Sequence, residues 1–275
     1  MIISLKPSSK LLEKYIEQFY VFTKDGNHPT NYVCFPHKNI GISITKGVTL
    51  EFGDHSVLLN INKEIKDEIQ IGITGKYIKP VRMQYEGEIE EINIIFKPLG
   101  INHFLQDNLA THVPSFYQLL TLANWQLMAN DLFKLESTGQ RIAKLESFLL
   151  DNYREIDDKG ISKAIQLIED IESNHSIKKV AELCGVSSKS MERNFKQLMA
   201  CTPSEYKRIV RFRHSLGNGV NTELEKKLIE IAYDSQYYDQ SYFIREYKKL
   251  TGHNPKSFIK RVSKLTEGKL IWEIK

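Results

Sequence analysis

The feature that most constrains this chain is an internal repeat between residues 177 and 258. Ile177, Val180 and Ala181 recur as Leu228, Ile231 and Ala232, 51 positions later. A second apolar set recurs after 52 positions: Met191, Phe195, Leu198, Pro203 and Tyr206 correspond to Phe243, Tyr247, Leu250, Pro255 and Phe258. The apolar spacing in each copy predicts a short helix, a turn and a second helix. The extra residue of the second copy lies between two helices, where an insertion is tolerated.

Each second helix has a start signal. Ser187 and Asp239 lie four residues before the first apolar anchors, Met191 and Phe243. At that position a side-chain oxygen accepts a hydrogen bond from a free backbone N–H. Two helices joined by a tight turn form a helix-turn-helix, whose second helix enters the DNA major groove. We therefore predict helix-turn-helix units at about 177–199 and 228–250.

The repeated segment resembles the AraC/XylS family of bacterial transcription regulators. The resemblance rests on residues 231–232, 235–249, 251–252 and Pro255 in the second copy, and on Val186, Ser187, Met191, Arg193, 195–196 and Pro203 in the first. It covers roughly residues 160 to 262 and implies a sequence-specific DNA-binding regulator. Family habit favours an activator over a repressor, which makes RNA polymerase a candidate partner.

One position departs from the family pattern. The family usually has glycine before the aromatic residue of the second turn, and this chain has Gln236. A left-handed backbone would strain glutamine, so we expect the second turn to be built differently, through its extra residue.

The charge of the chain is unevenly divided. Residues 1–160 carry 17 lysines and arginines against 20 aspartates and glutamates, a net of −3. Residues 161–275 carry 21 against 14, a net of +7. The basic half is the repeated half, as expected for a surface that neutralises phosphates, although a solvated lysine surface would give the same balance.

The first hundred residues predict a small β-barrel or sandwich. Short alternating segments at 39–45, 48–52, 55–59, 69–73, 77–83 and 92–96 are separated by turn residues, with a hairpin expected at Lys46-Gly47. Residues 11–22 fit either a helix or a strand. Beyond Pro98 the period changes, and helices are expected at 101–108, 114–122, 124–135 and 140–153. The last of these either covers the barrel or pairs with its twin in a dimer.

The charged stretch 154–160 ends in glycine, and we place the domain junction there. The predicted fold class is therefore α+β: a β-barrel-type sensor or dimerisation domain with C-terminal helices at 1–158, then an all-α DNA-binding domain at 159–275. A helix at 161–172 opens the second domain. A linker helix at about 203–216 joins the two units and ends at Gly217-Asn218-Gly219.

The β-part also resembles a cupin-like sensor domain found ahead of some AraC-type regulators. The resemblance covers about residues 1–120 and rests on Phe35-Pro36, residues 75–80 and residues 94–100. It implies an unknown small-molecule effector as a candidate partner.

No catalytic constellation, cofactor motif or metal-ligand set is evident. Gly75-Lys76 lacks the other residues of a phosphate-binding loop, and Cys34 and His37 have no second ligand pair. The N-terminus lacks a signal-peptide layout, and no apolar run approaches the roughly 18 residues that span a membrane. We expect a cytoplasmic protein that is not an enzyme, with no cofactor, no metal and no membrane partner.

The expected partner is double-stranded DNA, bound by a monomer or a homodimer. With the anchors facing inward, the residues left to contact bases are Ser188, Lys189, Glu192, Arg193, Gln240, Ser241, Tyr242 and Arg245. Those assigned to phosphates are Lys196, Lys248 and Lys249. Two rivals remain: an enzyme or small-molecule-binding protein whose helical half makes only protein contacts, and a regulator whose β-domain only dimerises. A cavity within the β-domain would argue against the second rival.

Overall fold

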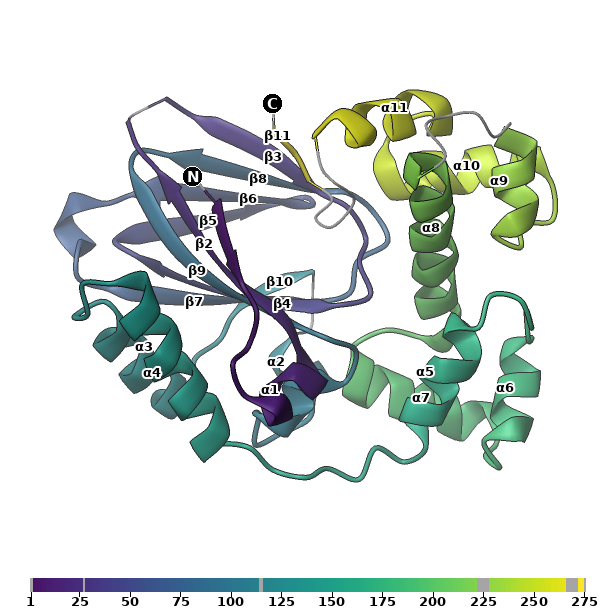
Figure 1. Ribbon diagram of the computed structural model, residues 1–275, viewed down its shortest axis with the longest axis horizontal. Helices are drawn as coiled ribbons and strands as arrows, with labels where there is room; N and C mark the ends of the chain where they lie inside the picture. Colours follow the sequence, from purple (N-terminus) through teal and green to yellow (C-terminus); the bar gives the residue numbers. More distant parts are fainter. Residues whose placement is uncertain (1, 27, 114–115, 222–227, 266–271, 275) are drawn as a thin grey trace.

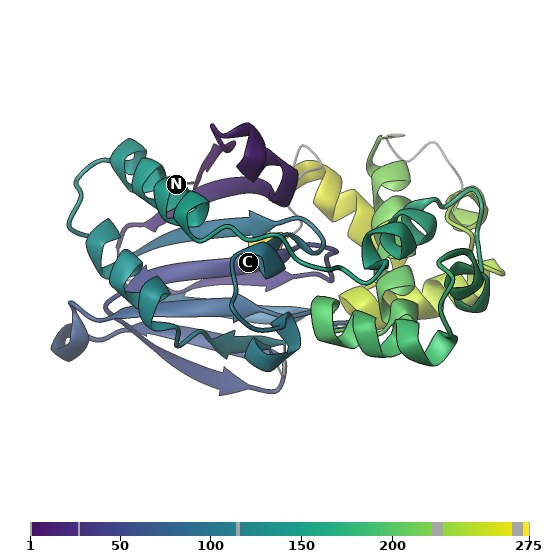
Figure 2. The same ribbon diagram turned by 90° about the horizontal axis from the view of Figure 1, so that it is seen from below.

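The computed structural model describes residues 2–26, 28–113, 116–221, 228–265 and 272–274. A β-rich part and a helical part lie side by side in Figure 1, and Figure 2 shows them end to end along the molecule. Helix α4 (Thr138–Asp151) belongs to the first part, and α5 (Ile161–Glu169) opens the second. This arrangement confirms the predicted α+β class.

The first layer of the β-rich part is a six-stranded antiparallel sheet. Its order is β1 (Ile2–Leu5), β2 (Ile16–Lys24), β9 (Ile89–Phe96), β4 (Ile40–Lys46), β7 (Ile69–Thr74) and β10 (Tyr117–Leu119). In the central strands the register places Ile42 opposite both Ile94 and Ile73. Side chains alternate across a strand, so these isoleucines all lie on one face.

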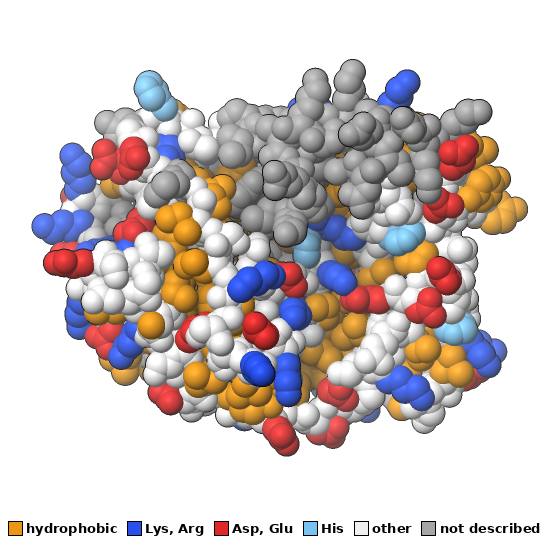
Figure 3. Space-filling view, in the orientation of Figure 1, with side chains coloured by type: hydrophobic (Ala, Val, Ile, Leu, Met, Phe, Trp, Pro, Cys, Tyr) orange, Lys and Arg blue, Asp and Glu red, His pale blue; other side chains and the backbone are white. Residues whose placement is uncertain are grey.

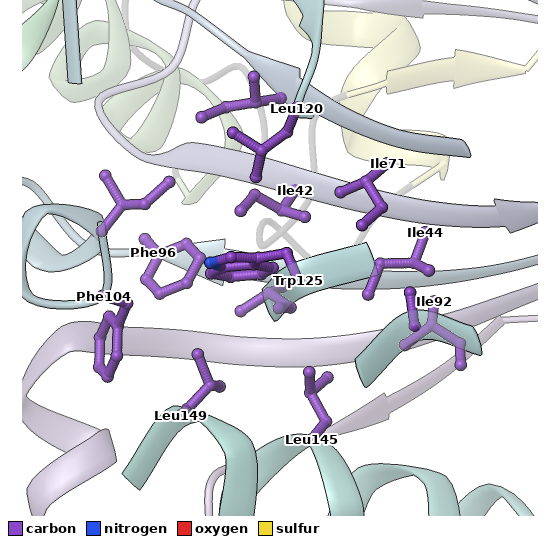
Figure 4. Close-up of a cluster of buried hydrophobic side chains, with 14 of the residues drawn as sticks. Ile42, Ile44, Ile71, Ile92, Phe96, Phe104, Leu120, Trp125, Leu145 and Leu149 are labelled. Atoms are coloured by element: carbon purple, nitrogen blue, oxygen red, sulfur yellow. The ribbon is translucent and has the colours of Figure 1, made fainter. Parts of the chain in front are cut away.

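Helices α3 (Ala123–Leu132) and α4 cover that isoleucine-rich face. Figure 4 shows Trp125 among Ile42, Phe96 and neighbouring side chains, with Leu145 and Leu149 reaching in from α4. All five are buried, and α4 begins with a capping box between Ser137 and Gln140. The expected helix at 140–153 therefore covers the sheet.

The second layer is a five-stranded sheet that packs on the other face of the first. Its order is β11 (Trp272–Ile274), β3 (Thr30–Cys34), β8 (Val81–Glu86), β6 (Ser56–Ile61) and β5 (Val48–Gly53). The β6–β8 pair is parallel and the other pairs are antiparallel. A separate apolar cluster lies between the layers.

The expected hairpin at Lys46-Gly47 is wrong, because β4 and β5 lie in different sheets. Gly47 has φ +68, its N–H donates to the carbonyl of Glu68 at 2.8 Å, and its carbonyl accepts from the N–H of Asn62 at 2.9 Å. These bonds turn the chain from one layer into the other, and a glycine provides the left-handed conformation.

Several other expectations need correction. Residues 11–22 contain both alternatives, α1 (Lys10–Tyr15) followed directly by β2. The expected helix 101–108 is only a short 3₁₀ turn, Gly100–His103, with α2 (Leu109–His112) after it; a second 3₁₀ turn spans Lys63–Ile65. Within the expected helix 114–122, residues 117–119 form strand β10, because edge pairing with β7 satisfies their backbone groups. Pro114 lies outside the described residues.

The end of the chain returns to the β-rich part. Strand β11 pairs with β3, with Glu273 opposite Val33. The assignment of all of 159–275 to the DNA-binding domain is therefore wrong for 272–274, while Lys275 lies outside the described residues. A three-residue strand has too little periodicity to be predicted from sequence.

The helical part contains α5, the two helix-turn-helix units and one further helix after each unit. The first unit is α6 (Ile177–Leu183) and α7 (Ser188–Met199), and the second is α9 (Leu228–Asp234) and α10 (Gln240–Thr251). α8 (Pro203–Asn221) joins the units, and α11 (Pro255–Leu265) follows the second.

The two turns have the same backbone geometry. The N–H of Val186 donates to the carbonyl of Ala181 at 3.1 Å, and the N–H of Tyr237 donates to that of Ala232 at 3.0 Å. Gly185 (φ +70) and Gln236 (φ +58) occupy the same left-handed position. The expectation of a differently built second turn is wrong. The extra residue follows the turn and is Tyr238, which is 89% exposed.

The linker helix is longer than the predicted 203–216, because α8 continues through Gly217-Asn218-Gly219. A helical glycine costs only about 1 kcal/mol relative to alanine, which tertiary packing readily offsets. Here the packing is visible: a Cβ on Gly219 would lie 2.7 Å from Ile259 Cδ1 of α11. Gly219 thus lets α11 approach α8 closely.

This contact predicts opposite effects for two neighbouring glycines. Gly219→Ala should destabilise the protein by about 1–3 kcal/mol, because Ile259 must move. Gly217→Ala meets nothing within 4 Å and should stabilise it by about 0.5–1 kcal/mol through helix propensity. Thermal or urea unfolding of the two variants measures the difference. Equal shifts in both would contradict the assigned packing.

The strained turn gives a second prediction. Gln236→Gly should raise stability by roughly 0.5–1 kcal/mol, because relief of the left-handed conformation exceeds the entropy cost of glycine. Gly185→Ala at the equivalent position should lower it by roughly 1 kcal/mol. Both are measured by urea unfolding. A loss of stability in Gln236→Gly would show that the exposed hydrogen bond from Asn174 to Gln236 outweighs the strain.

Candidate nucleic-acid interface and ligand cavity

Caps and buried anchors position both second helices. Ser187 Oγ accepts from the N–H of Ser190 at 3.1 Å, and Asp239 Oδ1 accepts from the N–H of Tyr242 at 2.6 Å. The anchors predicted from the repeat are buried in both copies: Met191, Phe195 and Leu198 on α7, and Phe243, Tyr247 and Leu250 on α10. Each helix therefore has one face fixed in a core and the other turned outward.

One helix contributes to both cores. Tyr206 and Val210 of α8 pack with α5, α6 and α7, whereas Phe212 and Leu216 pack with α9, α10 and α11. Buried polar contacts reinforce each side. Tyr206 donates to Glu169 on α5, and Arg208 Nε lies 2.7 Å from Glu246 Oε2 on α10.

The structure leaves most of the predicted base-contacting residues at the surface. Ser188, Lys189, Glu192, Arg193, Ser241 and Arg245 are exposed, and Gln240 is half-buried. Tyr242 is also half-buried, packs beside the second core, and has the Arg245 guanidinium 6.0 Å from its ring centroid. Tyr242 thus supports Arg245 as well as facing outward.

The residues assigned to phosphates differ in their surroundings. Lys248 is exposed. Lys196 forms an ion pair of 2.7 Å with Glu192, so these two predicted DNA contacts bind each other in the structure. Lys249 lies 3.4 Å from Glu246, in a hollow shared with Arg208 and with Arg82 of the β-rich part.

On the face of the molecule seen in Figure 3, acidic and basic side chains are interspersed over the part that the structure describes. A basic field therefore does not by itself mark the interface. The candidate interface rests instead on the two capped helices.

A cavity of about 130 Å³ lies between the two sheets. Its walls come from both layers and from α8, and they include Tyr20, Tyr32, Cys34, Phe35, His37, Tyr77, Met83, Glu91, Asn93, Tyr117 and Arg213. Sequence reasoning did not identify this site. A signal was present in β9, where Glu91 and Asn93 alternate with Ile92 and Ile94, giving one strand a polar face and an apolar face.

A buried carboxylate stands at one end of a hydrogen-bond chain in this cavity. Tyr32 and Tyr85 hydroxyls lie 2.7 Å apart, and Tyr85 donates to Glu91. Glu91 is only 4% exposed, and burial raises the pKa of its carboxyl. Burial likewise raises the pKa values of Tyr32 and Tyr85, so the phenols remain protonated donors.

Arg213 brings the linker helix into the wall of the cavity. Its Nε donates to the carbonyl of Pro36 at 2.6 Å, and its Nη2 donates to the carbonyl of Phe35 at 2.9 Å. Burial lowers the pKa of its guanidinium to about 10, which leaves it charged at neutral pH. Phe35 also packs edge-on against Phe258 of α11, with 4.6 Å between ring centroids. The cavity wall thus contacts the helical part directly.

Within 2–26, 28–113, 116–221, 228–265 and 272–274, no group of three or more His, Cys, Asp or Glu is placed to hold a metal ion. Over the same residues, no helix is long and apolar enough to cross a membrane.

Comparisons with known proteins locate two families in the chain. Residues 180–261 match a helix-turn-helix domain, and residues 4–114 match a domain of unknown function, DUF6597. No curated protein matches the chain.

Among solved structures, the chain is similar to ToxT from Vibrio cholerae. Wild-type ToxT bound to an unsaturated fatty acid shares 15% identity at a TM-score of 0.47, covering 90% of this chain and 96% of that one. ToxT in its P21 crystal form shares 14% identity at a TM-score of 0.46, covering 88% of this chain and 97% of that one. The family match and the paired units together show that the C-terminal half of this chain carries a helix-turn-helix domain of the AraC type.

Proposed function

We propose that this protein is a sequence-specific DNA-binding transcription regulator whose β-domain responds to a small molecule. The observation that carries the proposal is the pair of capped second helices with the same turn geometry, held by one shared helix. A chain built only for protein contacts needs no such duplication of a major-groove element.

The two helices are proposed to contact different sequences. On α7, Arg193 can form a bidentate contact with guanine, and Lys189 and Ser188 stand beside it. On α10, Gln240 suits adenine and Arg245 suits guanine. Glu192 can accept from cytosine only after it separates from Lys196, which would then be released to a phosphate. Lys248 and Lys249 are proposed to contact phosphates beside α10.

The shared helix sets the distance between the two contacts. The 19 residues of α8 span roughly 28 Å at 1.5 Å per residue. Because α8 is buried in both cores, it acts as a rigid spacer. Successive major grooves on one face of DNA are about 34 Å apart, which is somewhat more than this span. One chain is therefore proposed to bind two unlike short sequences about 10 base pairs apart on bent DNA.

The cavity favours a sensor over a domain that only dimerises, because a filled core would leave no such space. Arg213 and Phe35 offer the route by which an occupied cavity would alter the helical part. We further propose that the protein is not an enzyme, that it works in the cytoplasm as an activator in contact with RNA polymerase, and that it binds DNA as a monomer or a homodimer.

Substitutions on the two helices test the assigned roles. Arg193→Ala and Arg245→Ala should each weaken cognate binding by roughly 1–3 kcal/mol and relax discrimination at one or two base pairs. Lys248→Ala should weaken all sequences alike and lower the salt slope by about one. Selection from random DNA, followed by fluorescence anisotropy at several salt concentrations, measures both effects. Unchanged base preference in both arginine variants would show that the assigned faces are wrong.

The spacing of the two sites gives an independent test. Five base pairs added between the two elements would place them on opposite faces of the duplex, so affinity for the pair should nearly disappear. Ten added base pairs would return the two elements to the same face of the duplex. Their separation would then be greater than the length of α8, so binding should stay weak. Footprinting of the spacer series reports which element is occupied. Undiminished affinity with five added base pairs would mean that only one helix contacts DNA.

A further inference from the structure

The Glu91 end of the cavity is built from aromatic rings around a carboxylate. A smaller pocket shares Tyr20, Tyr32, Glu91 and Asn93 with the cavity and is also lined by Phe22 and Tyr85. The ring centroids of Phe22 and Tyr32 each lie 5.3 Å from that of Tyr85. Aromatic faces attract cations, most strongly in a desolvated site.

The carboxylate at this end has no basic partner among the residues that the structure describes. Glu91 accepts from the Tyr85 hydroxyl, and no ion pair joins it to a described lysine, arginine or histidine. Beside it, Asn93 Nδ2 is buried and forms no hydrogen bond of ordinary geometry, although its nearness to Glu91 partly offsets the effect of burial on the pKa of that carboxyl. A buried carboxylate left without a cation costs free energy, since burial disfavours its charged form.

The other glutamate of the strand shows the ordinary arrangement. Glu90 points to the opposite face of β9, where it forms an ion pair with Arg141 of α4. β9 thus carries Glu90, which pairs with an arginine of the protein, and next to it Glu91, which faces the cavity.

Arg213 does not supply the missing charge. Arg213 and Glu91 both line the larger cavity, but only Glu91 also lines the smaller pocket, and two nitrogens of Arg213 already donate to backbone carbonyls. The electrostatic preference of the Glu91 end is therefore set by the carboxylate and by the aromatic faces.

We propose that this cavity binds a small organic ammonium ion, with its cationic group against Glu91 and the surrounding tyrosine rings. The inference rests on the proposed function only in calling this ligand the effector. A space of roughly 150 Å³ holds a benzene-sized molecule, so the ligand is about the size of one ring with a short amine. Its apolar part lies toward Met83 and Phe35, which line the cavity between Glu91's strand and the helical part.

Binding of such a cation should release a proton. Burial raises the pKa of Glu91 above its ordinary value of 4.5, and a bound ammonium would lower it again. The affinity should therefore rise with pH as Glu91 loses its proton, and level off above its pKa. The titratable groups whose charges act on Glu91 are Tyr20, Tyr32, Cys34, Tyr85 and Tyr117, and burial raises the pKa of each, so they stay neutral over this range.

The test is calorimetric titration of the full chain with three probes of nearly equal size: benzylamine, benzyl alcohol and benzoate. Benzylamine should bind roughly 10–100-fold more tightly than benzyl alcohol, the range expected of a hydrogen bond to a charged partner. Benzoate should bind most weakly. Titrations in buffers of different ionisation enthalpy should detect the released proton.

Two variants assign the preference to its residue. Glu91→Gln should remove the preference for the amine and the proton release, while its amide oxygen can still accept from Tyr85. Glu88→Gln, which removes an exposed charge just before the same strand, should retain both. Equal binding of amine and alcohol by the native chain, tighter binding of benzoate, or an amine preference that survives in folded Glu91→Gln would each overturn the inference.

Measurements of DNA and amine binding by the native chain distinguish failure of this inference from failure of the proposed function. Sequence-specific DNA binding without any benzylamine selectivity would leave the regulator in place and refute the cation site. Selective amine binding by a chain that selects no DNA sequence would do the reverse.

Discussion

The arrangement of the helical part depends on one helix that is buried in two cores. In α8, Val210 completes the first core and Phe212 the second. Residues two apart on a helix project about 200° from each other, so the two units must lie on opposite sides of α8. Each large apolar side chain contributes roughly 1.5–3 kcal/mol when buried, and neither core is complete without this helix. The placement of α7 relative to α10 is thus a consequence of helical geometry.

Sequence periodicity predicted this half well for a physical reason. Each short helix has apolar anchors at helical spacing and a side-chain cap, and both signals are local. The predicted units, 177–199 and 228–250, agree closely with α6–α7 and α9–α10. The errors arose where contacts outside the periodic pattern decide the backbone. Gln236 adopts a left-handed conformation because its turn is fixed by Ala232 and Tyr237, and α8 continues through Gly219 because Ile259 packs there.

The β-rich part was predicted only in outline. Alternation located most strands, but it cannot tell which strands share a sheet, and so the turn at Gly47 was taken for a hairpin. Strands β10 and β11 are held by backbone pairing, and three residues are too few to show a recognisable sequence pattern. The cavity was missed for a related reason. A polar residue in a strand usually faces solvent, and only the second sheet shows that Glu91 faces inward.

Polar residues on the inward face of β9 lower the stability of the protein, and this cost indicates that they serve a function. Isoleucines in place of Glu91 and Asn93 would continue the pattern of β9 and would pack between the sheets as Ile92 and Ile94 do against the helices. A carboxyl and an amide there sacrifice apolar burial and require hydrogen bonds that the protein itself only partly supplies. A ligand can supply the remainder, and the stability lost in the empty protein then becomes affinity for that ligand.

The action of a ligand on DNA binding has a thermodynamic limit. A ligand shifts the helical part only by as much as it prefers one arrangement of that part over another. Two contacts can carry such a preference: the hydrogen bonds of Arg213 to Phe35 and Pro36, and the packing of Phe35 on Phe258. Arg213 lies on α8, one residue beyond Phe212 of the second core, so a displacement of its guanidinium acts on the helix that sets the spacing. Phe258 lies on α11 and packs near Tyr247 of α10. A ligand in the cavity would therefore act on α8 and on α10 through Phe35 and Arg213.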